Sequence, residues 1–323
     1  MPEFAQYEER PDASPEVDLE DEPDAGPIRI PKWVWLVCIA LAVPSLFGFG
    51  GRWAHQLKTL PEPRHPTGNL TAWSSAAFSQ IPVAHEQCYL ANNRWNTLGN
   101  ADSMEQETFV VDDSGQESFG WRWRSPWLLF SKIVAYPEVV CGAKPWDTPM
   151  GRIDGFPFHP APNSPRLTAD FHSELEAVGT YNLAFSLWAV SQLPATPQNI
   201  QTEVMIWTAQ AGQRPSGKPL GVITVNGVRW EVWVNDRQRD AAGTNSSEWT
   251  YVAYVAQTPV TGGPLSISAF LDDAVDRHLM TPDAYVTDLE FGDEVSEGSG
   301  FAQIRGFRLH FDPQEATSTA FQP

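Results

Sequence analysis

An acidic side chain lies inside one of the most apolar runs of the sequence. The run TEVMIW covers residues 202–207, and Glu203 is its one charged residue. Because side chains alternate between the two faces of a strand, Glu203, Met205 and Trp207 share one face, and the other three residues share the face expected in the core. A carboxylate beside a thioether and an indole indicates the lining of a cleft.

A second acidic cluster late in the chain offers a chemical partner for Glu203. Hydrolysis of a glycosidic bond commonly uses two carboxylates, one of which protonates the leaving oxygen. The segment EFGDEVSEGSG (290–300) supplies four candidates: Glu290, Asp293, Glu294 and Glu297. Glu294 ranks first because it follows a predicted strand and stands in a glycine-flanked segment, whereas Glu290 belongs inside that strand and could equally be a solvated face residue. A solvated surface loop is the alternative for the whole segment.

The elements that must position these residues are mostly strands. Alternating or short apolar runs predict ten of them, at 88–95, 107–113, 132–140, 180–190, 202–209, 221–225, 228–234, 249–257, 284–292 and 301–311. Asn226-Gly227 predicts a hairpin turn, and helical spacing of apolar residues over 266–279 predicts one amphipathic helix. This pattern predicts an all-β jelly-roll sandwich of two antiparallel sheets with one late α-helix.

The N-terminal part of the chain differs in composition from the rest. Residues 1–32 hold ten Asp or Glu against three Arg or Lys, which predicts a disordered acidic tail. Residues 33–51 carry no charge and are long enough to cross a bilayer, so they predict a transmembrane or signal-anchor helix, with a cleaved signal peptide as the alternative. Proline-rich residues 52–84 predict a linker, residues 85–312 a globular domain, and residues 313–323 a C-terminal tail.

The charge and the cysteines of the chain limit which binding partners and which cellular compartment are expected. The net charge of −19 and the lack of a basic patch argue against nucleic acid. Scattered histidines predict no metal, and no cofactor is expected. We expect a monomer whose globular part lies outside the cell, held at the membrane by residues 33–51 or secreted if that segment is cleaved. There Cys88 and Cys141 could form a disulfide, although two free thiols fit nearly as well.

Several motifs, taken in chain order, resemble those of glycoside hydrolase family 12, a family of small β-jelly-roll endoglucanases. They are NNRWN (92–96), YPEVVCG (136–142), TEVMIW, VNGVRWEVW (225–233) and FGDEVSEGSG (291–300). The resemblance runs through much of residues 88–311. It implies a retaining endo-β-1,4-glucanase that acts on cellulose-like, mixed-linkage or xyloglucan β-glucan by double displacement.

The resemblance also implies roles for individual residues. Glu203 would be the nucleophile and Glu294 the acid–base residue. The implied substrate contacts are Asn93, Trp95, Trp123, Met205, Trp207 and Pro215. Ser186 stands where the family usually has an acid that hydrogen-bonds the nucleophile, and a serine carries no charge. This departure keeps a second interpretation open, a catalytically weak or silent membrane-anchored β-glucan-binding protein, and a surface sandwich that binds no sugar is a third.

Overall fold

The computed structural model describes seven stretches of the chain. They are residues 59–84, 87–97, 104–126, 133–146, 154–161, 164–240 and 246–312. The predicted acidic tail, the apolar segment 33–51 and the C-terminal tail lie outside them. Within the described stretches, no helix is long and apolar enough to cross a bilayer.

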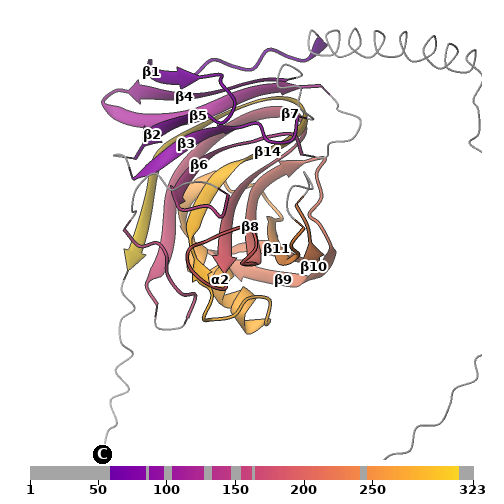
Figure 1. Cartoon of the computed structure of the whole chain (residues 1–323). Helices are drawn as coiled ribbons and strands as arrows, with labels where there is room; N and C mark the ends of the chain where they lie inside the picture. Colours follow the sequence, from indigo (N-terminus) through magenta and orange to yellow (C-terminus); the bar gives the residue numbers. More distant parts are fainter. Residues whose placement is uncertain are drawn as a thin grey trace, which may run out of the picture. The chain divides into compact units, whose positions relative to one another are not determined.

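Strands dominate these residues, and one amphipathic helix, α2 (Ile267–Asp276), follows β12 (Figure 1). The strands are β1 (Asn69–Ser74), β2 (Gln80–Val83), β3 (Cys88–Asn93), β4 (Glu105–Asp113), β5 (Gln116–Ser125), β6 (Tyr136–Gly142), β7 (Arg166–Val190), β8 (Ile200–Ala211), β9 (Lys218–Val225), β10 (Val228–Gln238), β11 (Trp249–Ala256), β12 (Gly262–Ser266), β13 (Tyr285–Val286) and β14 (Asp288–Asp312). The all-β architecture with a late helix is therefore confirmed.

Two long antiparallel strands, β7 and β14, connect the two layers of the fold. Residues 288–292 of β14 pair with β6, whereas residues 298–305 pair with β5. One layer is thus ordered β1-β4-β5-β14-β7-β12, and the other β2-β3-β6-β14-β7-β8-β11-β10-β9. The second layer is not purely antiparallel as predicted, because β8 and β11 run parallel.

Aromatic side chains fill the space between the layers. The rings of Phe185 and Phe291 stack with centroids 4.2 Å apart, and Phe171 packs against both edge-on. The helix α2 covers the far side of the second layer through Phe270, whose ring contacts Trp230 of β10. Burying aromatic rings in this way stabilises the sandwich by removing large apolar areas from water.

A disulfide and a tight turn fix two strand registers. Cys88 and Cys141 form a cross-strand disulfide with 4.4 Å between their Cα atoms, so β3 is joined covalently to β6. The sequence left this pairing open. The predicted hairpin between β9 and β10 is present, and both of its turn residues, Asn226 and Gly227, have positive φ, as a two-residue hairpin of this kind requires.

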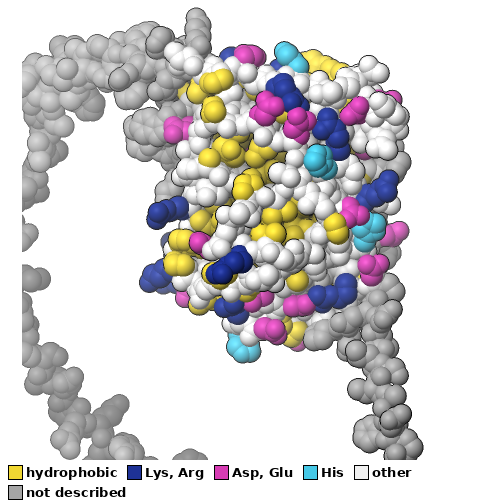
Figure 2. Space-filling view, turned by 180° about the vertical axis from the view of Figure 1, so that it is seen from behind, with side chains coloured by type: hydrophobic (Ala, Val, Ile, Leu, Met, Phe, Trp, Pro, Cys, Tyr) yellow, Lys and Arg dark blue, Asp and Glu magenta, His cyan; other side chains and the backbone are white. Residues whose placement is uncertain are grey.

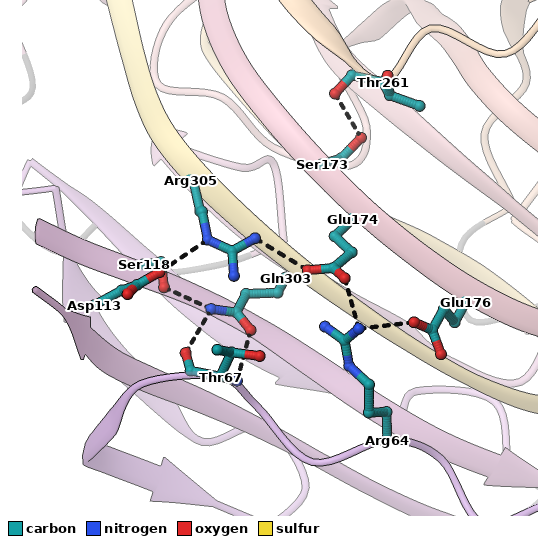
Figure 3. Close-up of polar contacts among 10 residues, drawn as sticks. All are labelled: Arg64, Thr67, Asp113, Ser118, Ser173, Glu174, Glu176, Thr261, Gln303 and Arg305. Atoms are coloured by element: carbon teal, nitrogen blue, oxygen red, sulfur yellow. Dashed lines mark hydrogen bonds and ion pairs between the residues drawn. The ribbon is translucent and has the colours of Figure 1, made fainter.

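The segment predicted to be a linker, 52–84, contributes to the fold from residue 59 onward. Strand β1 pairs with β4 and β2 pairs with β3, so the linker prediction is wrong for these residues. Figure 3 shows how the stretch before β1 is held: Arg64 meets Glu174 and Glu176, and Thr67 faces Gln303. We call residues 59–68 the strap. The folded unit therefore begins before residue 85.

Charge is distributed unevenly over the surface. On the face shown in Figure 2, hydrophobic side chains gather in a central band, and most charged side chains lie around it. Near the strap, Arg305 of β14 pairs with Glu174 at 3.0 Å and with Asp113 at 3.2 Å. Its two partners lie on β7 and on β4, so this ion network ties together strands of one layer.

Candidate active site

A cavity of about 400 Å³ opens on the second layer. Of the residues predicted to act there, six line it: Asn93, Trp95, Ser186, Glu203, Met205 and Glu294. Three others do not line it. Trp123 is buried in the core between the layers. Trp207 is buried in a small cluster with Met205 and Tyr251, and Pro215 is not among the cavity residues.

Glu203 reaches the cavity because of the alternation along β8. Its neighbours Thr202 and Val204 are buried on the opposite face, while Glu203 is partly exposed. One hydrogen bond orients its carboxylate: the indole Nε1–H of Trp249, on the parallel strand β11, donates to Glu203 Oε2 at 2.8 Å. The sequence did not single out Trp249, because nothing local reveals that β8 and β11 are neighbours.

Glu294 lies inside β14 rather than after the end of a strand, so its predicted position is wrong, and the alternative of a solvated surface loop is wrong as well. The strand continues through it with a register shift between Val295 and Glu297. The side-chain amide of Asn182, on β7, donates to Glu294 Oε2, and Gln213 donates to the same oxygen at 3.0 Å. The side chain of Asn182 also accepts the backbone N–H of Glu294 at 3.1 Å, so both ends of the residue are held.

The two carboxyl groups influence each other's protonation. Burial raises the pKa of Glu203 to about 8, with further raising by the charges of Glu294 and Glu290 and an opposing effect of the Trp249 hydrogen bond and of Lys144. Burial likewise raises the pKa of Glu294 to about 7, opposed by its amide donors. Both carboxyl groups therefore keep their protons to a higher pH than an exposed glutamate does.

The residues around the two carboxyl groups lie in different places. Ser186 of β7 is the cross-strand partner of Met205 on β8 and of Glu290 on β14. Glu290 is 2% exposed and lines the cavity floor, so the alternative of a solvated face residue is wrong for it. Asp293 points to the other side of β14, into the core, where Trp121 Nε1 donates to it at 2.6 Å. Glu297 does not line the cavity.

A buried ion cluster beneath the cavity was missed by the sequence reasoning. Lys144, just after β6, contacts Glu138 Oε1 at 2.7 Å and Glu290 Oε1 at 2.9 Å, and all three side chains are at most 8% exposed. A signal existed, since Lys144 is the one Lys or Arg in the stretch 133–151. Among the described residues, no group of three or more potential ligands has the arrangement of a metal site.

Three tryptophans form the wall beside Glu203. Trp188 of β7 pairs across strands with Glu203, and its ring meets those of Trp146 and Trp249 edge-on, with centroids 4.7 and 5.8 Å away. Trp146 is 40% exposed and lines the cavity. An exposed indole on a cavity wall is suited to stacking on a sugar ring, because the ring face of a sugar is apolar.

The chain is similar to known proteins in both sequence and structure. The model of the family described as glycosyl hydrolase family 12 matches residues 87–311. Endoglucanase S of Pectobacterium parmentieri is 26% identical over 243 residues, which is 74% of this chain and 87% of that protein. The family 12 xyloglucanase from Bacillus licheniformis superimposes with a TM-score of 0.64 at 24% identity, covering 74% of this chain and all of that one. Endoglucanase cel12A from Rhodothermus marinus does so with a TM-score of 0.62 at 22% identity, covering 76% of this chain and all of that one.

Proposed function

The chain belongs to glycosyl hydrolase family 12 and is a glycoside hydrolase, and on that premise we propose that it cleaves internal β-1,4-glucosidic bonds of a β-glucan with retention of configuration. One observation carries the proposal. Glu203 of β8 and Glu294 of β14 line the same cavity, and the charge of Glu294 raises the pKa of Glu203. Two interacting carboxyl groups in one sugar-sized cleft are what double displacement needs.

The proposed reaction has two steps. In the first, Glu203 attacks the anomeric carbon while protonated Glu294 donates its proton to the leaving oxygen, so that a glycosyl–enzyme ester forms and the glucan is cut. In the second, ionised Glu294 accepts a proton from water, and the water oxygen attacks the same carbon and releases Glu203. Asn182 and Gln213, which donate to Glu294, keep its carboxyl group oriented through both steps.

Substrate contacts are proposed for the residues that line the cavity on either side of this pair. Asn93 would bind sugar hydroxyls, and Trp95 and Trp146 would stack on ring faces. Met205 lies on the same face as Glu203 and would contact the sugar at the point of attack. Trp207, buried on the same face of β8, packs with Met205 in one cluster and would support it.

A second candidate function is favoured by the surroundings of the proposed nucleophile. Burial raises the pKa of Glu203 to about 8, so the empty cleft does not favour its ionised form near neutral pH. Ser186, on the strand beside β8, carries no charge. Together these features favour a catalytically weak or silent β-glucan-binding protein on the same scaffold.

Hydrolysis assays separate the two candidates. Purified protein should release reducing ends from at least one of carboxymethyl-cellulose, mixed-linkage glucan and xyloglucan, and NMR should show the β-anomer as the first product. Glu203→Gln should lower kcat by at least about 10³-fold with a nearly unchanged thermal midpoint. Binding of cellohexaose by the wild type without any product would support the silent binding protein instead.

We also propose that the domain works outside the cell, at the membrane or secreted. The disulfide between Cys88 and Cys141 supports an oxidising compartment. Fractionation of the producing cells, followed by detection of the protein in the membrane and the medium, tests this. Recovery of the protein with reduced cysteines in the cytosol would contradict it.

A further inference from the structure

The ion cluster under the cavity joins two parts of the site that no single strand joins. Lys144 bridges Glu138 of β6 and Glu290 of β14. Burying an ammonium and two carboxylates costs several kcal/mol per ion unless their geometry compensates. A buried ion cluster of this kind contributes little net stability to a fold. Its contacts with residues of the cleft therefore point to a role in the site.

Each glutamate of the cluster holds a different part of the cleft. Glu138 Oε1 accepts a hydrogen bond from Asn93 Nδ2 at 2.9 Å, and Asn93 lines the cavity from β3. Glu290 Oε1 accepts one from Trp188 Nε1 at 3.0 Å, and Trp188 is the cross-strand partner of Glu203. Lys144 is thus the midpoint of a connected path from Asn93 to Trp188.

We infer that the two glutamates are positioning residues with separate tasks: Glu290 sets the electrostatic environment of Glu203 and Glu294, and Glu138 fixes Asn93 for sugar binding. The inference rests on the proposed function for its catalytic meaning. Glu290 shares the cavity face of β14 with Glu294 and lies one strand away from β8, which places its charge beside both carboxyl groups.

The electrostatic surroundings of Glu290 agree with this assignment. The groups that face it are Lys144 and Glu138 from the β6 side, Tyr136 of β6, Asp288 and Glu294 on its own strand, and Glu203 of β8. After burial, the charge of Glu290 contributes to raising the pKa of Glu203 and of Glu294. Glu138 is not among the causes for either group.

Glu138 uses one of its two carboxylate oxygens for both of its hydrogen bonds. Its Oε1 is used by Lys144 and Asn93, whereas its Oε2 is buried and has no hydrogen-bond partner among the described residues. Burial and the charge of Glu290 raise the pKa of Glu138, against Lys144 and Asn93. Glu138 therefore holds the side-chain amide of Asn93 through the same oxygen that accepts from Lys144.

The test compares Glu290→Gln with Glu138→Gln. For Glu290→Gln, the removed charge should lower the pKa of both Glu203 and Glu294 by roughly half a pH unit, as read by ¹³C NMR of labelled glutamate carboxyls. Both limbs of the kcat/KM profile should move to lower pH by the same amount, with KM unchanged. For Glu138→Gln, the limbs should stay, and KM and the Kd for cellohexaose should rise roughly 3- to 10-fold.

Controls make the outcomes decisive. Glu297→Gln removes a carboxylate from the same strand outside the cavity and should change neither reading. An unchanged pKa of Glu203 and Glu294 in Glu290→Gln, or equal effects of the two cluster variants, would overturn the inference. If Glu290→Gln does not fold, Glu290→Asp, which withdraws the charge by one methylene, should give a smaller shift in the same direction, and no shift there counts against the inference. The NMR and Kd readings need no turnover, so an inactive wild type would refute the proposed function separately.

Discussion

At the scale of single residues, one indole hydrogen bond opposes the effect of burial on the pKa of Glu203. Trp249 Nε1–H donates to Glu203 Oε2 and lowers its pKa. Trp249→Phe should therefore raise that pKa, and because the nucleophile must be ionised, the acid limb of the kcat/KM profile should move to higher pH by roughly half a unit. This shift is opposite to the one expected for Glu290→Gln.

The matched control for this prediction is Trp233→Phe. The Nε1–H of Trp233 also donates to a glutamate, Glu231, but away from the cavity. A profile that moves equally in both variants, or not at all in Trp249→Phe, would show that the indole hydrogen bond does not control the nucleophile.

A second residue-scale prediction concerns the buried acid Asp293. Burial raises its pKa to about 7, against the hydrogen bond from Trp121. The folded state therefore binds its proton more tightly than the unfolded state, where the pKa is about 3.9. Its contribution to stability is complete below about pH 4 and is lost as pH rises through 7, by an amount on the order of 4 kcal/mol.

Asp293→Asn should remove this part of the pH dependence. Urea unfolding at pH 5 and pH 8 should show a smaller loss of free energy for the variant than for the wild type. Asp272→Asn, at a half-exposed position paired with Arg166, whose guanidinium stays charged at both pH values, is the control and should keep the wild-type difference. An identical loss in wild type and Asp293→Asn would mean that Asp293 remains ionised in the folded protein.

Residue-scale reasoning from the sequence found the site where its signal was local. Alternation placed Glu203 and Met205 on the cavity face, and both line it. Trp249 was missed because its partner Glu203 is 46 residues away, and the cluster of Lys144 was missed because one of its two glutamates, Glu290, comes from a strand that is distant in sequence. Trp123 has the same residue type as the cavity tryptophans, and only the fold shows that it faces the core.

At the scale of elements, the disulfide is the feature with the plainest consequence. It closes a loop with a sequence separation of 53 residues and joins β3, which carries Asn93, to β6, which carries Glu138. For a loop of this length, chain entropy predicts a stabilisation of roughly 4 kcal/mol. The double variant Cys88→Ser, Cys141→Ser should lose about that much in urea unfolding.

The same variant should bind substrate more weakly, because the register of β3 against β6 positions Asn93. Cys38→Ser, which leaves the disulfide intact, is the control for loss of a thiol. If the reduced wild type unfolds at the same urea concentration as the oxidised one, the disulfide contributes nothing measurable to the fold.

Elements were predictable where their pattern was clean, and one clean pattern was overlooked. Residues 166–178 alternate throughout, with Leu167, Ala169 and Phe171 buried, yet this half of β7 was not predicted. Its charged outer face resembles a solvated loop in composition. The strand β14 was divided in two because its middle, residues 293–300, is acidic and glycine-rich with Val295 as its one apolar residue, so its own residue types do not predict its burial.

At the scale of the whole molecule, the strap and the first strand cover a side of the sandwich. Arg64 lies over the ring of Phe301 at 4.5 Å, and Phe301 packs with Phe109 and Val111 in a small buried cluster. A chain that begins at residue 87 lacks this cover. We expect it to lose about 4 kcal/mol, equivalent to roughly 10 °C in thermal midpoint, relative to a chain that begins at residue 59.

Calorimetry of the two shortened chains measures this difference. Arg64→Ala in the full-length protein is the milder companion and should lower the midpoint in the same direction. Equal midpoints for the chains that begin at 59 and 87 would mean that the strap and the first two strands are dispensable. Sequence composition could not anticipate their role, because prolines and polar residues dominate the segment, and the partners of Arg64 and Thr67 lie more than a hundred residues away.

Strand β1 is the last strand on its side of the sheet, and it lies before residue 87, where the match to the family model begins. The matched region alone therefore does not include the strand that closes this side of the sheet. A chimera joined at residue 87 would lack Phe78 and Gln80, which line the cavity. It would also present β4 as an unprotected border, with free backbone donors and acceptors on which a second chain can add a strand.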